Sequence, residues 1–301
     1  MYLYRLLYTD ILNAAKKGGT HMKKKQLVGY SILLAGLCAA AYIIKEKSEQ
    51  LPVLTGKLLI QTDSAYSDIY DLSTKTFEGH KISQFNAKML GGTPYVFSGY
   101  YGFERYDTRN KTVISIETNN DDHIENIVPV SEDTIYYLQN EEIREYRFES
   151  CSKTVLPDET VYYFDYNINT KDIYYQSPFG IFQYNEDTKL TSRIAEFCRD
   201  PKISPDNLHL AYSQLRGAPK TLFVQDMNNG KINSITVDTN IISYCFSPDS
   251  QYIAIYKPES VKINLKFKYN SYEIILWDYK NDKTYLLADD FDKICNIDWK
   301  N

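Results

Sequence analysis

The chain has 301 residues, of which 43% are hydrophobic, and a formal net charge of -5. This apolar share is enough for a substantial core and excludes a disordered chain. Because no basic block is present, we exclude binding to nucleic acid. Tyrosine occurs 28 times, and its preference for pleated, half-buried surfaces predicts β-structure.

The chain opens with 21 residues that precede a second methionine, Met22. Residues 17–22 (KGGTHM) can be encoded by a purine-rich ribosome-binding sequence and a start codon, as in bacteria. We therefore predict that translation begins at Met22 and that residues 1–21 are untranslated. The alternative is a short cytoplasmic tail with a weakly amphipathic helix over residues 2–15.

An uncharged apolar segment covers residues 27–44. At a rise of about 1.5 Å per residue it is about 27 Å long, close to the thickness of a bilayer core. Lysines at 23–25 precede it, so the positive-inside rule favours a cytoplasmic N-terminus. We predict a signal anchor or transmembrane helix over residues 22–47, which makes this a single-pass protein of the cell membrane. Cleavage near Ala41, giving a secreted protein, and lipidation of Cys38 are the alternatives.

After a linker over residues 48–54, a short motif recurs through residues 55–301. A strand ends in Asp or Asn, and the polar turn that follows ends in Lys. The copies are Tyr70-Asp71 to Lys75, Tyr106-Asp107 to Lys111, a degenerate Tyr146-Arg147 to Lys153, Tyr184-Asn185 to Lys189, Gln225-Asp226 to Lys231 and Trp277-Asp278 to Lys283. Their period of about 40 residues is typical of propeller blades.

Each period divides into four predicted strands. In the fifth they cover residues 200–204, 208–213, 221–225 and 232–237, and in the sixth 242–246, 252–256, 273–277 and 285–288. Innermost strands are predicted near 88–90, 127–130 and 162–165. The first period lacks an innermost strand, and residues 294–299 match one. We therefore predict an all-β, six-bladed propeller closed by its C-terminal strand, which leaves no open sheet edge.

Two hairpins carry the clearest family resemblance. They contain Ser204-Pro205-Asp206 followed by Leu-Ala-Tyr, and Ser247-Pro248-Asp249 followed by Ile-Ala-Ile-Tyr. This pattern resembles the WD40-like repeat of bacterial TolB-type β-propellers, and Trp277-Asp278 lies where WD40 repeats carry Trp-Asp. Asn207 and Ser250 replace the family's turn glycine. The resemblance implies a scaffold that binds a partner.

The topology predicts a regular face and a variable face. The four strands of each blade are lettered a to d from the channel outward. The Ser-Pro-Asp turns and the Lys-ending turns share one face, while the loops that join b to c and d to the next a share the other. An insertion at residues 257–271 predicts a basic hairpin on the variable face, and the d–a loops are acidic at Asp121, Asp122, Asp158, Glu159, Asp238, Asp289, Asp290 and Asp292. The candidate partner-binding residues are Tyr66, Tyr100, Tyr101, Phe179, Arg216, Lys262, Lys266, Phe267 and Lys268. Exposed aromatic and Arg side chains at loop tips are typical of interface anchors, although solvated loops have the same composition.

Signals of catalysis and of metal binding are poor. The chain has four histidines, no Gly-x-Ser-x-Gly motif, and no Cys-x-x-Cys pair among its five cysteines. We predict no catalytic, cofactor or metal residues; one disulfide among Cys151, Cys198, Cys245 and Cys295 remains open. The favoured hypothesis is a non-enzymatic, membrane-tethered, extracytoplasmic propeller that binds a protein, peptide or envelope polymer through the variable face. The alternative is a hydrolase or lyase acting on a glycan in the central channel.

Overall fold

The structure is a computed structural model in which contacts divide the chain into two units, Met1–Gln50 and Leu51–Asn301. It describes residues 51–62, 67–78, 87–91, 93–99, 102–116, 123–147, 150–156, 159–215, 220–237, 239–258, 272–291 and 294–300. The predictions for residues 1–21, 22–47 and 48–50 lie outside these residues. Within the described ranges, no helix is long and apolar enough to span a membrane.

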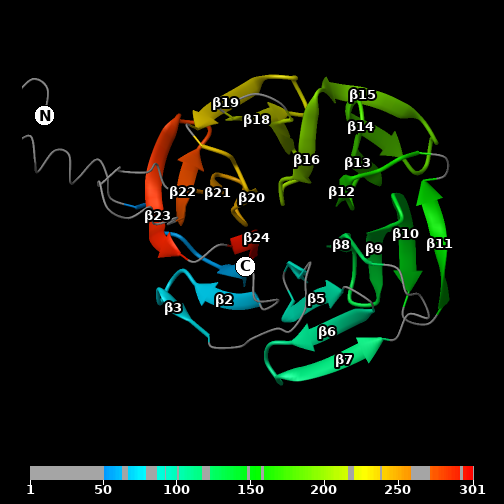
Figure 1. Ribbon diagram of the computed structural model, residues 1–301, viewed down its shortest axis with the longest axis horizontal. Helices are drawn as coiled ribbons and strands as arrows, with labels where there is room; N and C mark the ends of the chain where they lie inside the picture. Colours follow the sequence, from blue (N-terminus) through cyan, green and yellow to red (C-terminus); the bar gives the residue numbers. More distant parts are fainter. Residues whose placement is uncertain are drawn as a thin grey trace, which may run out of the picture. The chain divides into compact units, whose positions relative to one another are not determined.

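The second unit is a closed ring of six four-stranded antiparallel sheets, as Figure 1 shows. The prediction of an all-β, six-bladed propeller is confirmed. The ring closes through β24 (Ile294–Lys300), which pairs antiparallel with β1 (Lys57–Thr62) from the start of the unit. This strand is the innermost strand of blade 1, in agreement with the predicted C-terminal closure.

The strands follow one another from the channel outward in every blade. Blade 1 contains β24, β1, β2 (Ser67–Asp71) and β3 (Thr76–Phe77), and blade 2 contains β4 (Lys88–Met89), β5 (Tyr95–Gly99), β6 (Phe103–Asp107) and β7 (Thr112–Ile116). Blade 3 contains β8 (Asn126–Pro129), β9 (Thr134–Gln139), β10 (Glu142–Arg147) and β11 (Ser150–Leu156), and blade 4 contains β12 (Tyr163–Asn167), β13 (Asp172–Ser177), β14 (Gly180–Asn185) and β15 (Thr191–Glu196). Blade 5 contains β16 (Cys198–Ile203), β17 (His209–Gln214), β18 (Lys220–Asp226) and β19 (Ile232–Val237), and blade 6 contains β20 (Ser243–Phe246), β21 (Ile253–Pro258), β22 (Tyr272–Asp278) and β23 (Lys283–Phe291).

The recurring Asp or Asn closes the turn between the third and fourth strands. In blade 1, Asp71 Oδ1 accepts from the amides of Ser73 (2.8 Å) and Thr74 (3.0 Å). Lys75 then adopts a left-handed φ of 56°, which lets the chain reverse. These side-chain bonds to the backbone are the reason that Asp and Asn favour turns. The degenerate copy differs, because β11 begins at Ser150 and Lys153 therefore lies within the strand.

The two Ser-Pro-Asp turns contact each other across blades 5 and 6. In each, a serine hydroxyl donates to the turn aspartate, as Ser204 Oγ does to Asp206 Oδ1 (2.5 Å). Asn207 and Ser250 have left-handed φ values of 59° and 54°. The Asp206 amide donates to the hydroxyl of the buried Ser250 (3.0 Å), so this serine joins the two copies of the turn.

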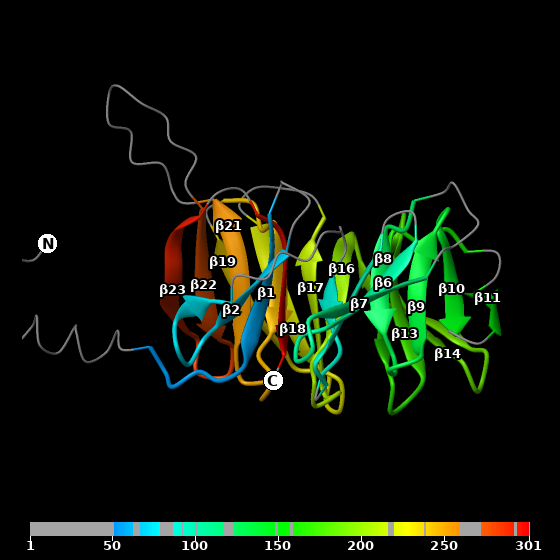
Figure 2. The ribbon, with the colours of Figure 1, turned by 90° about the horizontal axis from the view of Figure 1, so that it is seen from below.

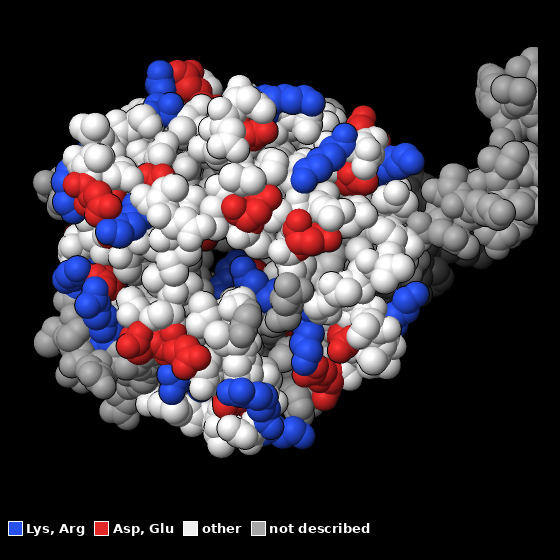
Figure 3. Space-filling view, turned by 180° about the vertical axis from the view of Figure 1, so that it is seen from behind, with Lys and Arg blue, Asp and Glu red and all other residues white. Residues whose placement is uncertain are grey.

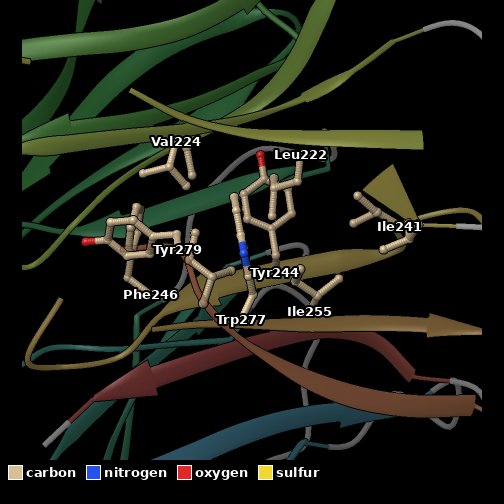
Figure 4. Close-up of a cluster of buried hydrophobic side chains, with 11 residues drawn as sticks. Leu222, Val224, Ile241, Tyr244, Phe246, Ile255, Trp277 and Tyr279 are labelled. Carbon is tan, nitrogen blue, oxygen red and sulfur yellow. The ribbon is translucent and has the colours of Figure 1, made fainter. Parts of the chain in front are cut away.

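The hydrophobic core consists of clusters that join neighbouring blades. Figure 4 shows the cluster between blades 5 and 6, where Trp277 of β22 packs against residues of β18 and β20. Only 1% of the Trp277 surface is exposed. The tryptophan of the Trp-Asp pair therefore stabilises the contact between blades, and its partner Asp278 caps a turn by accepting from Asn281.

The two rims of the ring differ in what they carry. The turn rim contains the a–b and c–d turns, and the loop rim contains the b–c and d–a connections. Figure 2 shows the ring edge-on, with the C-terminus and the segment that leads into β1 at the same rim. This is the turn rim, because β24 and β1 are the first two strands of blade 1, and the end of β24 lies beside the start of β1. There, Trp299 Nε1 donates to the Thr55 carbonyl (3.0 Å).

Candidate functional site

Of the nine predicted partner-binding residues, Phe179 is the one that the structure describes. Tyr66, Tyr100, Tyr101, Arg216, Lys262, Lys266, Phe267 and Lys268 lie outside the described residues, and so does the insertion at 259–271. Of the acidic loop residues, Glu159 is exposed, as predicted. Asp289 and Asp290 do not belong to a loop, because β23 extends to Phe291; the prediction for these two residues was wrong.

Phe179 lies at the tip of a two-residue turn on the loop rim. The turn joins β13 to β14, where Ser177 pairs with Gly180. The Phe179 amide donates to Ser177 Oγ (3.2 Å), and 68% of the residue is exposed. Gly180 has a φ of 142°, and a Cβ placed there would lie 2.0 Å from the Ala195 carbonyl oxygen, so only glycine fits. The turn therefore fixes the backbone of an exposed aromatic residue.

Two further exposed aromatic residues lie on the loop rim: Phe197, whose amide bonds to Phe179, and Tyr162, whose amide bonds to Gln176. Phe197 is the single residue between β15 and β16; its amide donates to the Phe179 carbonyl (3.3 Å), and 56% of it is exposed. Tyr162 precedes β12, donates its amide to the Gln176 carbonyl (2.9 Å) and is 45% exposed. We call Tyr162, Phe179 and Phe197 the aromatic patch.

The backbone at Phe197 is strained. Its φ of 52° is unfavourable for a bulky residue. The carbonyl of Phe197 accepts from the Leu215 amide (2.8 Å), which ties it to the end of β17 in blade 5. Strained, exposed residues that are held by their surroundings occur preferentially at functional sites.

Sequence reasoning found one of the three patch residues. Tyr162 was assigned to an innermost strand, whereas β12 begins one residue later, at Tyr163. Phe197 was not considered at all. The signal for Phe197 was its place in a one-residue connection between two strands. A large aromatic residue is not expected to be buried there.

The central channel is the second candidate site, and a ring of six equivalent residues lines it. Each innermost strand contributes one residue at the same register position. These are Asp298 opposite Leu59, Lys88 opposite Phe97, Val128 opposite Tyr136, Asp165 opposite Tyr174, Lys202 opposite Ala211 and Cys245 opposite Ala254. All six line one cavity of about 390 Å³, and Figure 3 shows a hollow with basic side chains at the centre of the ring.

A second cavity, of about 280 Å³, lies on the other side of this ring of residues. Asn126, Ser243 and Asn296 line it from the first halves of the innermost strands. Three residues, Lys88, Tyr163 and Lys202, line both cavities. We call these three residues the waist of the channel.

The carboxylates of the ring are engaged by the next blade. Asp298 Oδ2 accepts from the Met89 amide (3.0 Å), and Asp165 Oδ2 accepts from the Ile203 amide (2.8 Å). Burial alone would raise the pKa of Asp298, but Lys300 and Lys88 outweigh it and hold that pKa below its ordinary value. Burial raises the pKa of Asp165. Both carboxylates therefore also stabilise the contacts between neighbouring blades.

The two waist lysines have different electrostatic environments. Burial lowers the pKa of Lys202 to about 8, and repulsion from Lys88 adds to this effect. Burial acts the same way on Lys88, but Tyr163, Asp298 and Asp165 outweigh it and raise the pKa of Lys88. Burial also raises the pKa of the Cys245 thiol to about 12. Of the two waist lysines, Lys202 is thus the one that loses its proton more easily near neutral pH.

Across the ranges that the structure describes, no group of three or more His, Cys, Asp or Glu side chains is placed to hold a metal ion. Cys198 and Cys245 are free, buried thiols. The side chains of Cys151 and Cys295 lie outside the description, so no disulfide between them is tested.

Comparison with solved structures identifies TolB-like propellers among the structural neighbours. TolB from Acinetobacter baumannii superposes with a TM-score of 0.64 at 14% identity, covering 88% of this chain and 71% of that one. Putative TolB from Agrobacterium tumefaciens gives 0.57 at 12% identity, covering 78% and 90%. The propeller domain of Cps50 (Swd1) from Myceliophteria thermophila gives 0.51 at 10% identity, covering 78% and 85%. No family profile and no curated protein matches the sequence. These likenesses establish a TolB-like β-propeller fold.

Proposed function

We propose that this chain is a non-enzymatic propeller that binds a protein or peptide partner through its loop rim, with the aromatic patch as the anchor. The observation that carries the proposal is that Phe179 and Phe197 are both more than half exposed and yet fixed to each other by a backbone hydrogen bond. An exposed aromatic ring held in place loses little conformational entropy on binding. A patch of this kind is suited to docking a partner.

The tether forms the second part of the proposal. We propose that residues 27–44 anchor the chain in the cell membrane, with the propeller on the extracytoplasmic side. The apolar length of this segment and the preceding lysines support the anchor. The chain enters the ring on the turn rim, where the Trp299 indole donates to the Thr55 carbonyl.

Site-specific photo-crosslinking tests the binding surface. A photoreactive phenylalanine analogue is placed at Phe179 or at Phe197 in the full chain and irradiated in native membranes. Leu208 is the matched control, because it is 44% exposed at a turn tip on the opposite rim. We expect one discrete adduct from both patch positions and none from Leu208. Equal adducts from all three positions, or none from the patch, would contradict the proposed surface.

Surface labelling tests the location. A membrane-impermeant amine reagent added to intact spheroplasts should modify exposed lysines of the propeller such as Lys231. Labelling that occurs only after the membrane is lysed would contradict an extracytoplasmic propeller. Removal of residues 27–44 should release the protein from the membrane fraction.

One observation favours the alternative of a glycan hydrolase or lyase in the channel. Asp165 and Asp298 line the same cavity and have pKa values displaced in opposite directions, as in the acid and base pairs of glycosidases. However, both oxygens of Asp165 accept backbone amides, from Tyr166 (3.0 Å) and Ile203 (2.8 Å), so its carboxylate is held as part of the fold. Cleavage of an envelope glycan that Asp165→Asn abolishes in a folded protein would establish the enzyme instead.

A further inference from the structure

The waist of the channel contains two largely buried ammonium groups, and neither has a hydrogen-bond acceptor among the residues that the structure describes. Lys202 is 7% exposed, and the Lys88 side chain is 12% exposed. Lys88 Nζ lies 4.0 Å from Asp298 Oδ1, beyond hydrogen-bonding distance. Among the described residues, the contacts of Lys202 Nζ are with the rings of Tyr163 and Tyr244, whose centres are 6.0 Å and 5.4 Å away.

Contacts with aromatic rings do not compensate for the burial of an ammonium group. A cation over a ring gains about 0.5–1 kcal/mol at exposed sites and about 2 when desolvated, whereas burying an unpaired charge opposes folding by several kcal/mol. Both oxygens of Asp165 accept backbone amides. Asp298 Oδ1 lies 4.0 Å from both Lys88 Nζ and Lys300 Nζ, which is an ion-pair distance but too long for a hydrogen bond. The waist therefore has a positive charge that an anion could satisfy.

The third waist residue adds a donor. The Tyr163 hydroxyl makes no hydrogen bond among the residues that the structure describes, and Tyr163 lines both cavities together with the two lysines. Burial raises the pKa of Tyr163 to about 12, so the phenol keeps its proton at neutral pH. Two ammonium groups and one hydroxyl group thus line the same section of the channel.

We propose that the waist is a binding site for an oxyanion, a carboxylate or a tetrahedral phosphate-like group, held by Lys202, Lys88 and the Tyr163 hydroxyl. The adjoining cavity of about 390 Å³ is within the usual range for small-molecule sites and admits the rest of a small ligand. This site is separate from the aromatic patch, and it does not depend on the proposed function.

Several charged groups surround Lys202 and set the pH dependence of this site. They are Lys88 on β4, Tyr163 and Asp165 on β12, Arg199 and Asp200 on β16, Tyr244 and Cys245 on β20, and Asp298 and Lys300 on β24. Lys202 loses its proton first among the cations, at a pH of about 8. Affinity for an anion of constant charge should therefore fall as the pH rises from about 7 to 9.

Calorimetric titration of the full chain tests the site, with sodium sulfate in one experiment and sodium acetate in another. Sodium chloride keeps the ionic strength constant. Sulfate stands for a phosphate group and acetate for a carboxylate, and neither changes its charge between pH 7 and 9. We expect saturable binding of one stoichiometric anion, at least tenfold weaker in Lys202→Met and weaker again at pH 9. The matched control is Lys231→Met, an exposed lysine of the same blade, which should bind as the wild type does.

The results distinguish a phosphate-like ligand from a carboxylate ligand, and two of them would overturn the proposal. Binding of sulfate but not acetate assigns a phosphate-like ligand, and the reverse assigns a carboxylate. Absence of saturable binding of either anion to the wild type overturns the proposal, and so does equal affinity in Lys202→Met and Lys231→Met. If Lys202→Met does not fold, binding to Lys88→Met and the pH dependence of binding to the wild type test the proposal instead. A waist that holds only water predicts no anion binding at either pH.

Discussion

Lys202 is a buried lysine whose burial opposes folding. Its pKa is lowered to about 8 from the ordinary 10.5, so the unfolded chain holds this proton more tightly than the folded one. Such a group destabilises the folded state below about pH 8, and the penalty disappears as the pH approaches 10.5. The fold retains it although an apolar side chain would satisfy the packing better, which is consistent with a role in binding.

The variant Lys202→Met should therefore be more stable than the wild type. We expect a gain of about 1–3 kcal/mol in the free energy of unfolding near neutral pH in chloride buffer, from removal of a buried charge. The gain should shrink toward pH 10, where the wild-type lysine is neutral. Urea denaturation at both pH values measures it, and a variant less stable than the wild type at pH 7 would show that the ammonium group has a partner.

Ser250 and Asn207 occupy the same turn position with different consequences. Both have left-handed φ values, but only Ser250 accepts a hydrogen bond from the neighbouring blade, from the Asp206 amide at 3.0 Å. Glycine would relieve the backbone at either position. We expect Asn207→Gly to be neutral or slightly stabilising and Ser250→Gly to lose about 1 kcal/mol. Thermal unfolding of the two variants measures the difference, and equal effects would mean that the bond between the turns contributes nothing.

At the scale of the strand, β24 has more influence than its length suggests. Trp299 is 1% exposed and joins the core cluster between blades 1 and 6. Its indole nitrogen donates to the Thr55 carbonyl (3.0 Å). Trp299 therefore adds a packing contact and a hydrogen bond to the strand pairing that closes the ring.

Two substitutions of Trp299 separate these contributions. Trp299→Phe should lose about 1–2 kcal/mol, because the ring remains but its hydrogen bond does not. Trp299→Ala should lose about 3–5 kcal/mol and leave a cavity between the first and last blades. Chemical denaturation followed by tryptophan-independent far-UV circular dichroism measures both. Similar losses in the two variants would indicate that the hydrogen bond, not the packing, holds the strand.

The strands were predictable because the turn chemistry repeats. The register of blades 5 and 6 is set by the Asp that closes the turn between the third and fourth strands and by the two Ser-Pro-Asp hairpins. In these blades, the predicted strands agree with the observed strands β16–β23 except mainly at their ends. The site residues were not predictable in the same way. Phe197 and the six-residue ring of the channel become visible only when the innermost strands are aligned and closed, because their neighbours come from different blades.

At the scale of the whole molecule, the thiols report whether the ring is closed. Cys198 and Cys245 are 7% and 4% exposed, and burial raises the pKa of their thiols to about 11 and about 12. A bulky maleimide should therefore modify neither residue in the native protein at pH 8 and both after denaturation. Peptide mapping after labelling measures each site. Rapid modification of Cys245 in native protein would show that the channel admits reagents larger than the cavity suggests.

Ring closure by β24 has a consequence for how the protein is made. Trp299 and Thr55 are 244 residues apart in the sequence, so β24 and the other three strands of blade 1 leave the ribosome at opposite ends of synthesis. Until β24 emerges, β1 has an unpaired inner edge, which is the kind of edge that recruits other chains. Until then, five blades of the nascent chain can be complete while blade 1 still lacks its innermost strand. Its yield in cells should therefore respond to chaperones that cover strand edges more strongly than to changes in the stability of the finished ring.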